Sequence, residues 1–152
     1  MSSEKKAIKD VLDICHDGIK GYEQAAKDIH NEEFRTIFNR LAQQRKLFIE
    51  ELKNDMRDRG AELEDTGTIK GYFHRNWLDL KAKFSEKEDT VIIDEARTGE
   101  KEALEVYEKA INSDVPRYIK DRLEQQKRLI AGAIEQLNEF EREVTAHHGS
   151  SI

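Results

Sequence analysis

The stretch FRTIFNRLAQQRKLFIEELKNDM, from Phe34 to Met56, decides the fold of this chain. Its apolar residues recur every three or four positions, which is the spacing that places them on one face of an α-helix. Asn31 precedes the stretch, where its side chain can cap the helix, and Gly60 follows, where a helix commonly ends. The stretch therefore predicts a long amphipathic helix whose buried face consists of Phe34, Ile37, Phe38, Leu41, Phe48, Ile49, Leu52 and Met56.

The same periodicity predicts three further long helices. Two of them cover about residues 4–29 and 87–112, and the third ends near Ala146. Ser113 or Asp114 is expected to cap that last helix, because both side chains can accept a bond from a free backbone N–H. Only a very short turn separates the first two helices, so we expect them to be antiparallel neighbours.

A long connection, about residues 59–86, lies between the two helix pairs. It is expected to contain one short extra helix, about residues 69–84, rich in aromatic side chains. This helix would cover the bundle as a lid or, alternatively, form a small-molecule pocket or a dimer interface. Short connections within each pair and a long crossover between pairs predict an all-α, ferritin-like four-helix bundle in one domain, residues 1–146, with a frayed tail, residues 147–152.

Two of the predicted helices contain nearly the same octet. Arg40–Leu47 reads RLAQQRKL and Arg122–Leu129 reads RLEQQKRL, with five identical positions and two exchanges of one basic residue for another. Such similarity indicates a duplicated helix pair, although two helices rich in Gln and Lys can also resemble each other by chance.

Composition excludes several classes of function. The chain has 152 residues, 38% of them charged, and a net charge of −6, which disfavours nucleic-acid binding because that requires excess Lys and Arg. The opening MSSEKKAIKD resembles no signal peptide, and no window reaches the roughly 18 apolar residues of a membrane span. The single cysteine, Cys15, excludes an intrachain disulfide and fits a reducing compartment. We therefore expect a cytoplasmic protein without membrane or nucleic-acid partners.

Four segments carry a family resemblance. They read CHDGIKGYEQAAKD at 15–28, LAQQRKLFIEEL at 41–52, HRNWLDLK at 74–81 and TGEKEALEVYEKA at 98–110. With them the chain resembles bacterial ferritin-like bundle proteins of uncharacterised function, in the rubrerythrin and ferritin-like superfamily. The resemblance implies a ferritin-like fold and an association with stress responses.

Metal-binding members of that superfamily carry one Glu on the first and third helices and Glu-x-x-His on the second and fourth. Residues three apart on a helix face the same way, so both can reach one ion. Carried over, the resemblance implies a degenerate site in which a single ligand is retained and two positions are cationic. Its positions are Ile19, Arg45, Phe48, Glu100, Lys127 and Ile130.

The cationic positions suggest what replaces the metal. Arg45, Glu100 and Lys127 each fall between apolar residues of a predicted inward stripe. One hypothesis is a buried charge cluster around Glu100, completed by Glu23 or by a bound anion, because buried charges must be paired. The alternative is that the two basic side chains bury only their stems and extend to the solvent.

We therefore predict a protein without catalytic residues, metal or cofactor, which acts by association with a second copy, as a dimer, or with a protein partner. One alternative is a metal-dependent oxidoreductase or iron-handling protein with a displaced carboxylate site drawn from Glu23, Glu100, Glu102 and Glu105. Another is a binder of a small anion or organic ligand in the bundle core.

Overall fold

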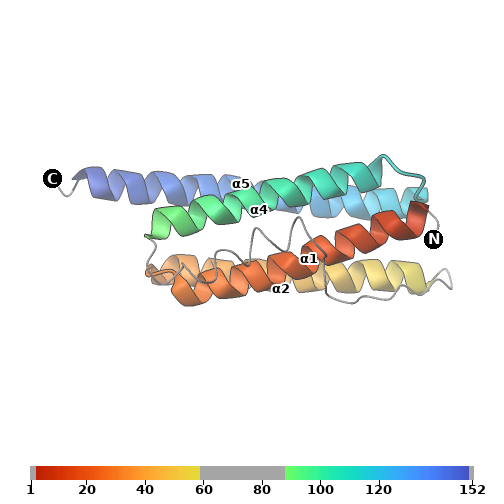
Figure 1. Ribbon diagram of the computed structural model, residues 1–152, viewed down its shortest axis with the longest axis horizontal. Helices are drawn as coiled ribbons and strands as arrows, with labels where there is room; N and C mark the ends of the chain where they lie inside the picture. Colours follow the sequence, from red (N-terminus) through yellow and green to blue (C-terminus); the bar gives the residue numbers. More distant parts are fainter. Residues whose placement is uncertain (1–2, 59–87, 151–152) are drawn as a thin grey trace.

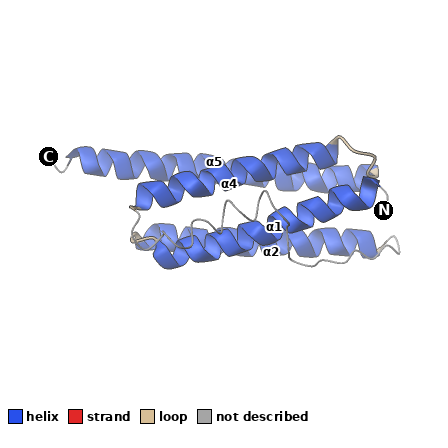
Figure 2. Ribbon diagram, viewed as in Figure 1, coloured by secondary structure: helices blue, strands red, loops and turns tan. Residues whose placement is uncertain are grey.

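The computed structural model describes residues 3–58 and 88–150. These residues are almost entirely helical, which confirms the all-α prediction (Figure 2). The helices pack as two pairs, α1 with α2 and α4 with α5 (Figure 1). Their bounds are α1 (Ser3–Asp28), α2 (Glu32–Arg57), α4 (Asp89–Ile111) and α5 (Arg117–Ser150).

The two helix pairs associate along the length of the bundle. Helix α1 packs on α4, and α2 also contacts α5. The yellow end of α2 and the green start of α4 lie at opposite ends of the bundle, so α2 and α4 run in the same direction (Figure 1). This connectivity agrees with two hairpins joined by a long crossover. The extra helix predicted within that crossover lies outside the described residues.

The turn between α1 and α2 is fixed by polar side chains. Asn31 caps α2 as predicted, with its side-chain oxygen accepting a bond from the Phe34 backbone N–H at 3.1 Å. Arg35 donates to the carbonyl oxygens of Ala26 and Ile29 at the end of α1. These bonds satisfy backbone groups that a helix end leaves free.

The ends of α5 differ from the prediction. Neither Ser113 nor Asp114 caps this helix, which begins at Arg117. The Ser113 hydroxyl instead donates to the carbonyl oxygen of Ala110, because the end of α4 has free acceptors at this point. At its other end α5 continues to Ser150, so residues 147–150 of the predicted frayed tail are helical, because the bonds that close an α-helix lie within its own backbone.

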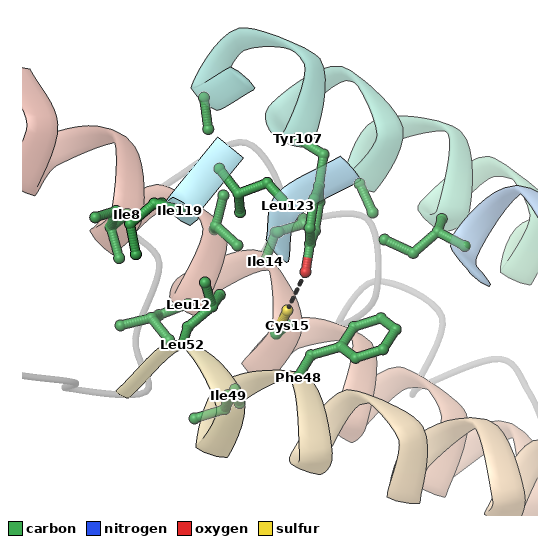
Figure 3. Packing of buried hydrophobic residues seen from close by; sticks show 14 of the residues in the cluster. Ile8, Leu12, Ile14, Cys15, Phe48, Ile49, Leu52, Tyr107, Ile119 and Leu123 are labelled. Atoms are coloured by element: carbon green, nitrogen blue, oxygen red, sulfur yellow. Dashed lines mark hydrogen bonds between the residues drawn. The ribbon is translucent and has the colours of Figure 1, made fainter. Parts of the chain in front are cut away.

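The buried apolar residues form two clusters, one in each half of the bundle. The Leu12 cluster includes Leu12, Cys15, Phe48, Leu52, Tyr107, Ile119, Leu123 and Ile130 (Figure 3). The Phe38 cluster includes Tyr22, Phe34, Phe38, Leu41, Ile92, Ala96, Ala133, Leu137 and Phe140. Arg45 on α2 and Glu100 on α4 lie at the boundary between the two clusters, because the buried apolar residues before and after each of them belong to different clusters.

None of the four described helices is both long enough and apolar enough to cross a membrane.

Candidate functional site

A buried ion pair joins the two helix pairs between the apolar clusters. The guanidinium of Arg45 on α2 donates from Nη1 to Oε1 of Glu100 at 2.6 Å and from Nη2 to Oε2 at 2.5 Å. Arg45 and Glu100 are each only 1% exposed. Such parallel bidentate pairing is the strongest geometry that an arginine and a carboxylate can adopt.

Three neighbours shape the space around this guanidinium. Its Cζ lies 5.7 Å from the ring centroid of Tyr22 and 5.5 Å from that of Phe48, within the range of cation–π contact. A Cβ atom at Gly18 would lie 3.5 Å from both Cγ and Nη1 of Arg45. These are ordinary van der Waals distances, so Gly18 packs directly against Arg45, and a side chain that extends beyond Cβ would meet the arginine.

The ion pair sets the protonation states at the centre. Burial by itself would lower the pKa of Arg45, but the charge of Glu100 and the bonds to it outweigh that effect and raise the pKa. Burial and the Glu100 charge both raise the pKa of Tyr22, so its hydroxyl stays neutral. Arg45 is therefore a permanent cation, and the carboxylate of Glu100 balances its charge.

Lys127 and Glu23 do not join the pair. Lys127 is bonded to Glu108 on the surface, and its side chain is 31% exposed. Glu23 lies 3.4 Å from Lys46, with both side chains largely in solvent. The predicted four-residue cluster is thus reduced to two residues, because one buried cation and one buried anion already neutralise each other.

A second polar network, which sequence reasoning missed, lies next to the ion pair. Tyr107 on α4 donates to Oε1 of Gln126 on α5 at 2.7 Å. The amide nitrogen of Gln126 donates to the carbonyl oxygen of Phe48 at 3.2 Å and to Glu51 at 3.1 Å. The Sγ atom of Cys15 on α1 lies 3.3 Å from the Tyr107 hydroxyl (Figure 3). All four described helices therefore contribute to this network.

The donor and the acceptor of each hydrogen bond in this network can be assigned. Burial raises the pKa of Tyr107 well above its ordinary value, so the hydroxyl keeps its proton. That proton goes to Gln126 Oε1, because the Gln126 amide nitrogen faces two acceptors and must point its hydrogens at them. The Tyr107 oxygen is then the acceptor in its contact with the Cys15 thiol.

The six positions that the resemblance assigns to a metal site do not fit a metal. Ile19, Phe48 and Ile130 are buried apolar side chains without ligand atoms. The retained ligand, Glu100, has both oxygens bonded to a cation, Arg45. Lys127, the sixth position, points to the surface. A divalent cation needs several oxygen, nitrogen or sulfur donors, and these positions offer one occupied carboxylate.

A displaced carboxylate site finds no support either. Across residues 3–58 and 88–150, no three His, Cys, Asp or Glu side chains come together as metal ligands would. The four carboxylates proposed for such a site are spread out, with Glu100 buried and Glu23 and Glu105 exposed. An anion-binding core is equally unsupported, because both Nη groups of Arg45 are bonded to Glu100.

Comparison with known families identifies a match for most of the chain. Residues 3–113 match a family model described as "Domain of unknown function (DUF2383)". A search of curated proteins finds no match. The matched residues include the Arg45–Glu100 pair, Cys15 and Tyr107, but not Gln126, which lies in α5.

Proposed function

The chain belongs to this DUF2383 family, and we propose that it is a non-enzymatic, ferritin-like helical protein that acts by association, in the first instance with a second copy of itself. The proposal has two parts. The centre of the bundle is a structural ion pair in place of a metal centre, and the working surface is the outer face shared by α2 and α5.

The closed centre argues against catalysis there. A catalytic or metal site keeps an open position for substrate, but the guanidinium of Arg45 occupies the space in front of Glu100. Two cavities along the described helices lie at the surface, one between α1 and α2 and one between α4 and α5. Charged and polar side chains such as Arg35 and Arg97 line them.

One observation carries the association proposal. Among the described residues, the large apolar side chains with the greatest exposure are Leu47, at 53%, and Leu129, at 47%. They are also the last residues of the two repeated octets. The sequence repeat thus ends in an exposed leucine on both α2 and α5.

Hydrogen bonds across the α2–α5 boundary place the two leucines at the same level. Arg122 bonds to Glu51 and Asp55, and these helices run in opposite directions. Seven residues after Arg122, Leu129 lies on the same side of α5 and about 10 Å further along it. On α2, Leu47 comes four residues before Glu51 and eight before Asp55, the acidic partners of Arg122. Leu47 therefore lies on the side of α2 that faces the same boundary, at a level similar to that of Leu129.

A pair of equivalent leucines at one level suits a two-fold interface, in which the same patch serves both subunits. The surrounding residues are polar, as is usual for the rim of an interface. Two leucines form a small apolar centre, so we expect weak, concentration-dependent association rather than an obligate dimer.

Light scattering coupled to size exclusion, over micromolar to millimolar protein concentrations, tests the proposal. The wild type should shift towards a dimer mass, and Leu47→Glu/Leu129→Glu should remain monomeric. Val91→Glu is the matched control, because Val91 is an exposed apolar residue on α4. A wild type that stays monomeric throughout, or equal effects of both changes, would contradict association through this face.

A further inference from the structure

We propose that the surroundings of Glu100 form a binding site for a guanidinium-type cation, which Arg45 fills from within the chain. The ligand class is a planar, delocalised, monovalent cation with paired N–H donors. The site would accept the free guanidinium ion if the Arg45 side chain were shortened. This inference goes beyond association and does not depend on it.

The hydrogen bonds explain the choice of ligand. Both Nη groups of Arg45 donate to the carboxylate of Glu100. Its Nε finds no acceptor within residues 3–58 and 88–150. Recognition therefore rests on the part of the side chain that a free guanidinium ion reproduces, and two parallel bonds to one carboxylate require that planar shape.

The surrounding surfaces fit the same shape. Rings of Tyr22 and Phe48 lie within 6 Å of the guanidinium carbon and offer π-faces to a delocalised cation. On the side of α1, Gly18 lies against the Arg45 side chain, where an added Cβ would be in van der Waals contact with it. Truncation of Arg45 to alanine would keep the carboxylate and both rings while opening a space of guanidinium size among them.

A divalent metal suits the opened site poorly. Glu100 is the one described carboxylate bonded to Arg45, and the adjacent Tyr22 keeps its proton. One carboxylate cannot replace the hydration shell of Mg²⁺, Ca²⁺ or Fe²⁺. The site therefore distinguishes cations by shape and hydrogen bonding rather than by charge density.

Thermal unfolding of Arg45→Ala in guanidinium chloride tests the proposal. Millimolar guanidinium should raise the Tm of this variant in a saturable manner, by about 3–6 °C at ten times the dissociation constant. Equal concentrations of KCl, urea or MgCl₂ should not. The wild type, whose site is filled, and Arg45→Ala/Glu100→Ala, which lacks the anion, should show no rise.

A reciprocal experiment covers the case in which Arg45→Ala does not fold. Glu100→Ala leaves the guanidinium of Arg45 without its anion, and formate should then raise the Tm of this variant but not that of the wild type. The proposal is overturned if two results occur together. Guanidinium would leave both the helical circular dichroism and the Tm of Arg45→Ala unchanged, and formate would leave those of Glu100→Ala unchanged. Equal responses of variants and wild type would also overturn it.

Discussion

The guanidinium of Arg45 and the carboxylate of Glu100 meet in parallel at the centre of the bundle, with N–O distances of 2.6 and 2.5 Å. Arg45 belongs to the first helix pair and Glu100 to the second, so this contact joins the two hairpins. It also lies where the core changes from the Leu12 cluster to the Phe38 cluster. The pair therefore fixes the relative position of the hairpins, in addition to neutralising two buried charges.

Removal of one partner should be costly. Arg45→Met or Glu100→Leu leaves an uncompensated buried charge, and we expect the free energy of unfolding to fall by about 3–5 kcal/mol. The double variant removes both charges and should recover much of that loss. Urea unfolding of all four proteins measures the coupling. Additive losses in the double variant would show that the two side chains act independently.

The buried tyrosines should make the protein sensitive to alkali. The pKa values of Tyr22 and Tyr107 are raised in the folded state, mainly by burial, above the ordinary 10.0. Their contribution to stability is therefore complete below about pH 10 and is lost as the pH rises above it. The absorbance of these tyrosinates should appear only as the helices unfold.

Phenylalanine variants test this pH dependence. Tyr107→Phe should reduce the slope of unfolding free energy against pH above pH 10 by about 1.4 kcal/mol per pH unit, the value for one proton. Tyr118→Phe, on an exposed tyrosine of α5, is the control and should leave the slope unchanged. Equal slopes in wild type and Tyr107→Phe would contradict a buried, neutral Tyr107.

The side-chain amide of Gln126 should contribute more to the stability of the fold than that of Gln125. Gln126→Leu removes the acceptor of the buried Tyr107 hydroxyl and a second donor to the Phe48 carbonyl oxygen within α2, at a cost of about 1–3 kcal/mol. Gln125→Leu, one residue earlier and exposed, should change stability by less than about 0.5 kcal/mol. Thermal unfolding gives both values, and similar effects at the two positions would argue against the network.

Two glycines within helices make a further matched pair. Gly132→Leu should stabilise α5 by about 0.5–1 kcal/mol through helix propensity, because an added Cβ would meet no atom within 4 Å. Leucine at Gly18 would enter the space of Arg45 and should destabilise the fold by about 1–3 kcal/mol. Stabilisation by both substitutions would show that Gly18 is not needed to make room for Arg45.

The sequence predicts the helices well and the centre only in part. Periodicity places Arg45 inside correctly, because Leu41 and Phe48 flank it at helical spacing and are themselves buried. For Lys127 the alternative prediction holds instead, since its side chain extends to the surface and the inward stripe of α5 runs through Gln126. One residue is about 100° of rotation, enough to move a side chain from the core to the surface.

The repeat explains why the charge-cluster hypothesis included Lys127. Arg45 and Lys127 are equivalent in the two octets, and equivalence suggests the same orientation. However, α2 and α5 present their octets to the core with different rotations, so α2 buries its cation and α5 buries a neutral amide. The spacing of Leu123, Gln126 and Ile130, three and then four residues, is the signal that could have identified Gln126.

The most direct test of the central claim, that an arginine stands where a metal would bind, is the iron content of untagged protein after aerobic loading with Fe(II) and removal of free metal. An Arg45–Glu100 pair that closes the centre predicts less than about a tenth of an iron per chain. One or two tightly held ions per chain, the content of a di-iron centre, would contradict the account.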